Sequence, residues 1–152
     1  MLSGRDLSLN DCNNIKEGIP YITGASNFQN GEIIINRWTK NPQVITEMGD
    51  LLITCKGTVG ELSINSLGKA HVARQVMAIK NTFSLNINYI QICMYYYVDA
   101  LQHKSKGLIP GISREDILKI ILPIPPCTEQ DRISSCYSKT IKKFKSIEFN
   151  LI

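Results

Sequence analysis

The apolar residues of this chain change their spacing near residue 85, and that change constrains the fold more than any other feature of the sequence. Before it, short β-rich runs lie at residues 19–23, 50–55, 61–65 and 72–79, with turn-forming residues between them. Several short strands at this spacing indicate a curved, mostly antiparallel sheet. The runs at 50–55 and 61–65 are close enough to predict a hairpin, with its turn between them.

After residue 85 the spacing becomes helical. Within residues 86–101, apolar side chains recur three or four positions apart, which predicts a helix with one buried face. A brief helix is predicted after Ser113, and a long one after Pro125-Pro126 with Thr128 as its N-cap. The long helix carries one apolar stripe, formed by Ile133, Tyr137, Ile141, Phe144, Ile147 and Leu151.

These elements predict an α+β fold: a curved, mostly antiparallel sheet with a packed helix, followed by a protruding C-terminal helix. We assign residues 1–126 to the domain and residues 127–152 to that helix. With 152 residues, 43% of them hydrophobic and 20% charged, the chain has enough apolar side chains for one core. No run approaches the roughly 18 apolar residues of a membrane span, and no secretory signal follows Met1, so we expect a cytoplasmic protein with no membrane partner.

The sequence signatures of catalysis are missing. There is no G-x-x-x-x-G-K-[ST] or G-x-G-x-x-G phosphate cradle and no G-x-S-x-G nucleophile turn. The five cysteines contain no C-x-x-C pair, which disfavours a zinc site. The acid pairs at Glu115-Asp116 and at Glu129 and Asp131 are explained by helix N-termini. We therefore expect neither catalysis nor a bound metal.

A set of short motifs follows one another in an order that identifies a likeness. The motifs are Gly18-Ile19-Pro20-Tyr21-Ile22-Thr23-Gly24-Ala25-Ser26-Asn27-Phe28, Gly49-Asp50-Leu51-Leu52-Ile53, Lys56-Gly57-Thr58-Val59-Gly60, Ala73-Arg74-Gln75, Gly107-Leu108-Ile109-Pro110-Gly111-Ile112-Ser113, Leu122-Pro123-Ile124-Pro125-Pro126, and Glu129-Gln130 with Ile133. In this order the chain resembles a target recognition domain of the specificity (S) subunit of type I restriction-modification enzymes. The resemblance spans about residues 4–148.

The resemblance implies a division of labour between subunits. An S subunit is not an enzyme: it binds one half of a split double-stranded DNA target with each recognition domain and holds methyltransferase (modification) subunits there. Those partners would supply S-adenosylmethionine, and a motor subunit would use ATP and Mg, so no cofactor is expected on this chain. The usual S subunit has two recognition domains and two spacer helices. This chain has one of each and is therefore a half-size subunit or a fragment, expected in the host defence of a prokaryotic cell.

Polar loops that leave a sheet are suited to contacting DNA. Lys and Arg neutralise phosphates, while amide, hydroxyl and guanidinium groups read base edges. Such groups lie in the loop at 23–30, the segment 37–40, the hairpin turn, the pair at 74–75 and the polar stretch at 102–106. The DNA-binding candidates are Thr23, Ser26, Asn27, Asn30, Arg37, Lys40, Lys56, Thr58, Arg74, Gln75, His103, Lys104 and Lys106.

Each group of candidates has a structural alternative. Asn27 and Asn30 are also suited to shaping turns. Arg74 and Gln75 interrupt an apolar run, so a buried structural pair is the alternative to base readout. The lysines of residues 102–106 are also compatible with an ordinary solvated loop.

The stripe on the terminal helix needs a partner where that helix leaves the domain. We expect its six residues to form a subunit interface, either with a methyltransferase subunit or in a homodimer whose two chains pair antiparallel through residues 128–152. Two other functions stay open. One is an assembly module for methyltransferase subunits without DNA readout, which would lack salt-dependent, sequence-selective DNA binding. The other is a minimal nuclease, which would cleave DNA in a metal-dependent manner.

Overall fold

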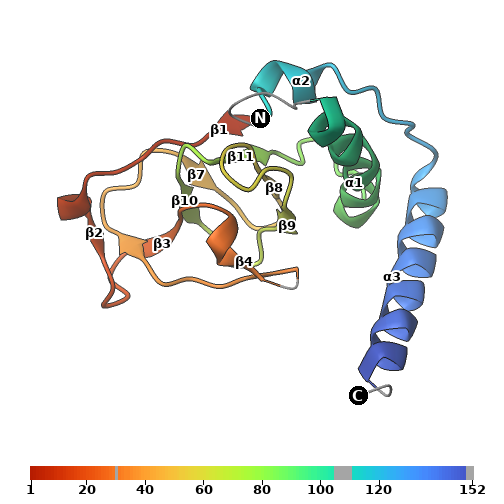
Figure 1. Ribbon diagram of the computed structural model, residues 1–152, viewed down its shortest axis with the longest axis horizontal. Coiled ribbons are helices and arrows are strands. Elements are labelled where there is room, and N and C mark those ends of the chain that lie inside the picture. Colours follow the sequence, from red (N-terminus) through yellow and green to blue (C-terminus); the bar gives the residue numbers. More distant parts are fainter. Residues whose placement is uncertain (30, 105–110, 150–152) are drawn as a thin grey trace.

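The computed structural model describes residues 1–29, 31–104 and 111–149, and its strands form two sheets and a short ribbon (Figure 1). The four-stranded sheet comprises, in order, β1 (Leu2–Ser3), β11 (Val76–Ile79), β8 (Leu51–Thr54) and β9 (Leu62–Ile64), all antiparallel. The five-stranded sheet comprises β2 (Cys12–Asn13), β6 (Trp38–Thr39), β3 (Ile19–Ile22), β10 (Ala70–Val72) and β7 (Ile45–Thr46). The ribbon is β4 (Phe28–Gln29) with β5 (Glu32–Ile33).

The α+β prediction is confirmed, with a finer division of the β part than expected. The single curved sheet of the prediction is divided into two sheets, and one pairing, between β3 and β10, is parallel. The predicted hairpin is β8–β9. The predicted run at 72–79 is two strands, β10 and β11, because the chain leaves one sheet at Val72 and enters the other at Val76.

Strand β8 lies between two apolar cores, so all of its residues are buried. Its Leu51 and Ile53 face a core shared with the helix α1 (Ile87–Lys104), whereas Leu52 faces a core shared with Ile22 and Val72 of the other sheet. Successive side chains of a strand point to opposite faces, which is why one strand serves both cores. A strand buried on both faces explains the continuous apolar run in the sequence.

Helix α1 covers the four-stranded sheet, as the apolar spacing predicted. Tyr89, Ile90, Met94 and Val98 are buried in the core that it shares with that sheet. The helix continues to Lys104, so the first part of the predicted polar loop at 102–106 is helical instead. The sequence has no breaker there before Gly107, and polar residues such as Gln and Lys are good helix formers.

The helix α2 (Arg114–Leu118) begins as predicted, because Ser113 and Asp116 form a capping box. The Ser113 N–H and hydroxyl donate to the Asp116 carboxylate at 2.9 and 2.6 Å, and the Ser113 hydroxyl accepts from the Asp116 N–H at 3.2 Å. The segment that follows, residues 119–124, is rich in β-forming residues, yet it forms no strand in the part of the chain that is described. It runs extended beside α1, where the hydroxyl of Tyr89 donates to the Pro123 carbonyl at 2.9 Å.

The helix α3 (Cys127–Phe149) starts one residue before the predicted cap Thr128, so that capping prediction is wrong. Its first turn is held instead by Gln130, which is 1% exposed. The Gln130 amide donates to the Pro125 carbonyl at 2.8 Å and accepts from the Asn86 N–H at 3.0 Å. This bond joins the start of α3 to the start of α1, and beyond it α3 projects away from the sheets (Figure 1).

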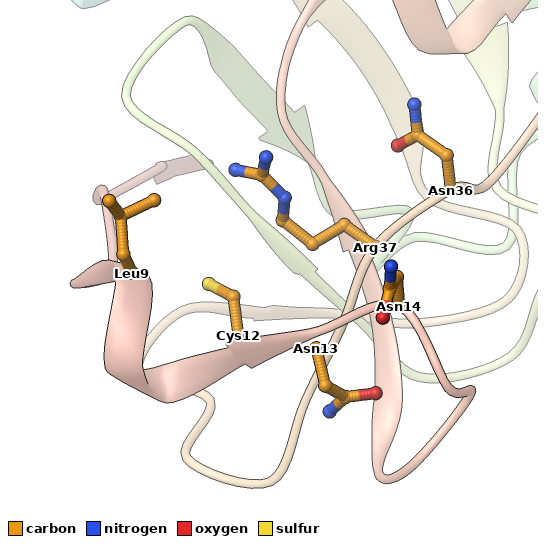
Figure 2. Close-up of a pocket in the computed structure, with 6 residues that line it drawn as sticks. All are labelled: Leu9, Cys12, Asn13, Asn14, Asn36 and Arg37. Atoms are coloured by element: carbon orange, nitrogen blue, oxygen red, sulfur yellow. The ribbon is translucent and has the colours of Figure 1, made fainter.

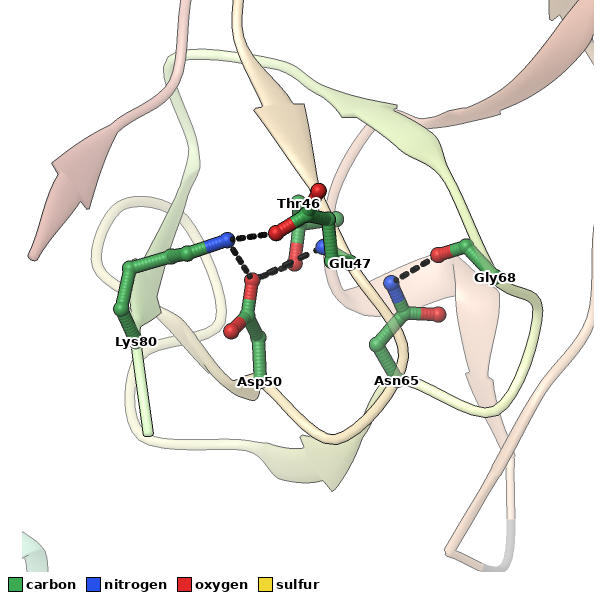
Figure 3. A network of polar contacts seen from close by, with 6 residues as sticks. All are labelled: Thr46, Glu47, Asp50, Asn65, Gly68 and Lys80. Carbon is green, nitrogen blue, oxygen red and sulfur yellow. Dashed lines mark hydrogen bonds and ion pairs between the residues drawn. The ribbon is translucent and has the colours of Figure 1, made fainter. Parts of the chain in front are cut away.

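A polar network formed by Thr46, Glu47, Asp50 and Lys80 joins the two sheets (Figure 3). The carboxylate of Asp50 is almost fully buried and accepts from the Thr46 hydroxyl at 2.9 Å and the Glu47 N–H at 2.8 Å. The ammonium of Lys80 lies 3.1 Å from the same Asp50 oxygen and 2.7 Å from Glu47. Because Thr46 ends β7 whereas Asp50 and Lys80 flank β8 and β11, the network fixes one sheet to the other.

Candidate nucleic-acid interface

Three loops meet at one end of the sheets because β3 and β10 are parallel. Val72 lies opposite Ile22, so the chain leaves both strands at the same end. Strand β11 returns antiparallel to β8, with Val76 opposite Thr54, which brings the β10–β11 turn beside the start of the hairpin turn. We call this end of the sheets the loop edge, and define it as residues 23–27, 55–59 and 73–75.

The turn at 73–75 is the centre of the loop edge. The Ala73 N–H donates to the Ile22 carbonyl at 2.9 Å, and the Gln75 carbonyl accepts from the Cys55 N–H at 2.8 Å. The backbone of the turn is therefore fixed on both sides, while the side chains of Arg74 and Gln75 are exposed. The alternative of a buried structural pair is wrong, because the two residues form the turn between two strands rather than the interior of one.

The loop at 23–27 is organised by Asn27, which is 1% exposed. Its side-chain oxygen accepts from the N–H and the hydroxyl of Thr23 at 2.8 and 3.0 Å, and its amide donates to the Ile34 carbonyl at 2.7 Å. Asn27 thus follows the turn-shaping alternative, and its prediction as a base-reading residue is corrected. It leaves Ser26 exposed on the 3₁₀ turn η2 (Ala25–Asn27).

The loop at 23–27 also touches the turn at 73–75. A Cβ built at Gly24 would overlap the amide oxygen of Gln75, so the end of the Gln75 side chain lies directly against this loop. The amide of Gln75 and the loop that carries Thr23 and Ser26 are therefore neighbours at the loop edge.

The hairpin turn adds a cation and a hydroxyl to the other side of the same turn. Lys56 and Thr58 are both exposed. The preceding Cys55 is buried and accepts at its carbonyl from the Ile112 N–H at 3.0 Å, and Lys56 forms a backbone bridge with Gly111. The structure thus brings six accessible sequence-predicted residues together at the loop edge: Thr23, Ser26, Lys56, Thr58, Arg74 and Gln75.

Arg37 lies further along the same end of the five-stranded sheet, in an open pocket (Figure 2). Its carbonyl accepts from the Tyr21 N–H at 2.8 Å, and its side chain extends across the pocket toward Leu9 and Cys12. The cavity has a volume of about 370 Å³ and is otherwise lined by Asn13, Asn14 and Asn36. Burial is the main cause that raises the pKa of the Cys12 thiol, so the sulfur lines the pocket as a neutral group.

Lys40 is not part of the loop edge. It follows Thr39, which lies opposite Ile19 at the start of β3, and its ammonium is paired with Glu17 at 2.5 Å. The sequence placed it near Arg37, but the two residues flank β6 and so lie toward opposite ends of that strand.

For the remaining DNA-binding candidates, either the side chain is not described or the whole residue lies outside the described part of the chain. His103 and Lys104 belong to the last turn of α1, and their side chains are not among those described. Asn30 and Lys106 lie outside the described residues.

Three residues at or beside this surface were missed from the sequence, and Asp6 is the first of them. The carboxylate of Asp6 accepts from the Arg74 N–H at 3.1 Å and lies 2.8 Å from the Arg74 guanidinium nitrogen Nε. The two residues are 68 positions apart, and no pattern in the sequence connects them. Asn14 and Asn36, which line the Arg37 pocket, were missed for the same reason.

The stripe on α3 divides into an attached and a projecting part. Ile133 packs against the core of the domain, whereas Tyr137 and Ile141 are 41% and 37% exposed. Tyr137 and Ile133 line a shallow apolar cavity of about 320 Å³ with Arg132, Cys136 and Thr140. Phe144 and Ile147 belong to α3, but their side chains are not described, and Leu151 lies outside the described residues.

Two further features bear on function. Within the described residues, no group of His, Cys, Asp and Glu side chains is placed to hold a metal ion. In the same part of the chain, none of the helices has the length and apolar character needed to cross a bilayer.

The chain matches, over residues 2–151, the family described as the type I restriction modification DNA specificity domain. One curated relative, a protein of Methanocaldococcus jannaschii described as a type I restriction enzyme MjaX specificity subunit, is 27% identical to this chain over 139 residues. That match covers 87% of this chain and 30% of the relative.

Two solved structures have the same fold. One, from work on complex assembly and conformational transition of the type I R-M system, has a TM-score of 0.88 at 21% identity and covers 98% of this chain and 37% of that one. The HsdS subunit from Thermoanaerobacter tengcongensis has a TM-score of 0.84 at 21% identity, with 98% and 36% covered. This chain spans about a third of the length of each of these relatives. Because the family model matches residues 2–151, the chain belongs to the family of type I restriction-modification DNA specificity domains, as its ordered motifs predicted.

Proposed function

We propose that this chain is a sequence-specific DNA-binding module that reads one half of a split target for a type I restriction-modification system. The observation that carries the proposal is the loop edge. It gathers hydroxyl, amide, guanidinium and ammonium groups from three loops on a backbone fixed by strand pairing. Base-edge readout needs such groups in fixed positions, and phosphate contacts need the cations.

The proposal gives separate roles to the groups of the loop edge. Ser26 and Gln75 suit hydrogen bonds to base edges, since both are exposed and each lies on a turn that hydrogen bonds hold in place. Lys56 suits a phosphate contact, because an exposed ammonium is a point charge without a preferred donor plane. Arg37, with Asn14 and Asn36, would extend the contact along the same end of the sheet.

The proposed partners are double-stranded DNA and methyltransferase subunits. S-adenosylmethionine, ATP and Mg would belong to the methyltransferase and motor subunits, and the assembly would work in the cytoplasm of a prokaryotic cell. We propose residues 1–126 as the recognition domain and residues 127–152 as a spacer helix. The exposed Tyr137 and Ile141 on the projecting part of α3 support a role of this helix in docking a methyltransferase subunit or a second copy of the chain.

The direct test selects duplexes from a random double-stranded library with the purified 152-residue chain. Affinity is then measured for the selected duplex and for a scrambled duplex over a range of salt concentrations. We expect an enriched motif and an affinity that falls with salt. The double variant Lys56→Ala, Arg74→Ala should reduce the slope of log affinity against log salt by about 2, roughly one unit per lost phosphate contact.

A matched control removes the same charge from the opposite end of the sheet. Lys40 and Lys69 are exposed and lie next to β6 and β10, at the end away from the loop edge. The double variant Lys40→Ala, Lys69→Ala should leave the selected motif unchanged. Equal losses from the two double variants would mean that net charge, and not the loop edge, binds DNA. A chain that binds methyltransferase subunits but shows no sequence preference would be an assembly module.

A further inference from the structure

The N-terminal segment is fixed across the turn at the centre of the loop edge. The Gly4 N–H donates to the Val76 carbonyl at 3.0 Å, and the Arg5 N–H donates to the Val72 carbonyl at 2.9 Å. On its other side the Arg5 carbonyl lies 2.8 Å from Nε2 of the buried His71. These bonds attach the segment to β11 and β10 at the points where the turn begins and ends.

The segment can lie this close only because of Gly4. A Cβ at that position would overlap the Ala73 carbonyl, so any other residue would push the segment off the turn. On the far side, the Leu7 N–H donates to the hydroxyl of Tyr21 at 3.3 Å. The backbone hydrogen bonds of Arg5 and Leu7, on either side of Asp6 in the sequence, therefore fix Asp6 next to the turn.

The Asp6 carboxylate contacts two different groups of Arg74. Its Oδ1 accepts from the backbone N–H of Arg74 at 3.1 Å, and its Oδ2 lies 2.8 Å from Nε of the Arg74 guanidinium. Both side chains stay accessible, with 68% of Arg74 and 46% of Asp6 exposed. Within the described residues, the two terminal amino groups of Arg74 make no hydrogen bond, so the end of the guanidinium is available to a ligand.

We infer that Asp6 is a positioning residue that aims the free end of the Arg74 guanidinium at DNA. The inference rests on the proposed function and adds to it a residue that touches no DNA itself. With Nε held, the two terminal amino groups form a fork that fits two adjacent acceptors. DNA offers such a pair in two places, the oxygens of one phosphate and the O6 and N7 atoms of guanine.

Stability alone does not account for this pair. Exposed ion pairs contribute little to folding, and the backbone bonds of Gly4 and Arg5 already fix the segment. A carboxylate at a DNA-binding surface also repels phosphates, so its removal raises affinity for every duplex if charge is all that matters. A positioning role predicts the opposite sign, since a guanidinium that loses its orientation has to be ordered again on binding.

The experiment compares Asp6→Asn with wild-type chain on the selected and the scrambled duplex. Asp6→Asn removes the charge and keeps the shape, and we expect affinity for the selected duplex to fall about tenfold, within the range of one bidentate contact. Arg74→Lys should cause a similar loss, and Asp6→Asn should add little in the Arg74→Lys background because the two residues act together. The matched control is Glu17→Gln, which neutralises the acid of the exposed Lys40–Glu17 pair at the opposite end of β3.

The same measurements tell the two DNA groups apart. If the fork contacts guanine, the loss is confined to the selected duplex and disappears when 7-deazaguanine replaces one guanine. If it contacts a phosphate, both duplexes lose affinity and the salt slope decreases. Either result supports the inference. Unchanged affinity, or higher affinity for both duplexes, overturns it while the proposed function stands; a wild-type chain that binds no DNA overturns both. Thermal unfolding of each variant checks that the fold is intact.

Discussion

The ammonium of Lys80 lies 3.1 Å from Oδ2 of the buried carboxylate of Asp50, at the place where the two sheets are joined. The Lys80 side chain is 26% exposed and that of Asp50 only 5% exposed, so this pair is shielded from solvent far better than the exposed pair of Lys40 with Glu17. Because of this difference in burial, we expect the Lys80–Asp50 pair to contribute to the stability of the fold and the Lys40–Glu17 pair to contribute little.

Replacing Asp50 by Ala should lower the free energy of unfolding by about 2–4 kcal/mol. The change leaves the Thr46 hydroxyl, the Glu47 N–H and the Lys80 ammonium without their shared acceptor. Urea unfolding at neutral pH measures the loss. In the control Lys40→Met, the free energy of unfolding should change by less than about 1 kcal/mol. Similar losses of unfolding free energy in Asp50→Ala and Lys40→Met would contradict the expected difference between the buried and the exposed pair.

Stability should fall as the pH drops below 7, because of His71. Burial is the main cause that lowers the pKa of this histidine below its ordinary value of 6.5. Its Nδ1 accepts from the Val44 N–H at 3.1 Å while Nε2 faces the Arg5 carbonyl at 2.8 Å, an arrangement that needs the neutral ring. The unfolded chain therefore binds a proton near pH 6.5 that the folded chain does not.

The sign follows from this difference in bound protons. The contribution of His71 is fully present above its unfolded pKa and is lost as the pH falls toward the folded value, by at most about 1.4 kcal/mol per pH unit. Urea unfolding between pH 7.5 and 5 should show it. His71→Gln should be less stable at neutral pH but should lose less stability on acidification. A variant with the same pH profile as wild type would exclude His71 as the source.

Asn27→Ala and Ser26→Ala should behave differently although the two residues are neighbours. Asn27 makes hydrogen bonds that close its loop, so its loss should cost about 1–3 kcal/mol of folding free energy. Ser26 is exposed, and its change should leave stability within about 0.5 kcal/mol of wild type. DNA selection with Ser26→Ala should alter the preferred sequence. An unaltered motif would remove Ser26 from the reading surface.

Gln130→Ala should loosen the attachment of α3 to the domain. The change removes the buried bonds to the Pro125 carbonyl and the Asn86 N–H, at a cost of about 1–3 kcal/mol. Hydrogen exchange should increase in the first turns of α3 and at the start of α1, while β8 and β11 stay protected. Equal increases in both regions would show that the domain and the helix unfold as one unit.

Ile141→Asp should weaken any assembly that α3 mediates. Ile141 lies on the projecting part of the stripe and is 37% exposed, so a charge there costs little in the free chain but much in a packed interface. Lys139→Asp on another face of α3 is the control. Sedimentation of the chain alone, and with a methyltransferase subunit, measures both variants. If α3 forms the proposed interface, the assembly is weakened by Ile141→Asp and unchanged by Lys139→Asp.

Much of the fold could be predicted because local patterns agree with the final structure. The capping box at Ser113, the hairpin β8–β9 and the buried face of α1 all depend on residues close in sequence. The N-cap of α3 could not be predicted from Thr128, because a tertiary hydrogen bond from the Asn86 N–H to the Gln130 side chain fixes the first turn.

The candidate site was predictable only in part, for the same reason. The polar loops could be identified as loops, but the burial of Asn27 depends on its bond to Ile34 across the β4–β5 ribbon. The position of Asp6 against Arg74 depends on long-range pairing of the N-terminal segment with β10 and β11. Sequence patterns report on periodicity within one segment, whereas these relationships join segments that are distant along the chain.

The parallel pairing of β3 with β10 has a consequence for synthesis on the ribosome. Ile22 and Val72 are partners although about fifty residues separate them, so the five-stranded sheet cannot close until that whole stretch has been made. Contacts of this range slow folding, because the intervening chain must be ordered first. The nascent chain therefore exposes the apolar side chains of β3 and β8 until β10 and β11 emerge, and during that interval it is the most vulnerable to aggregation.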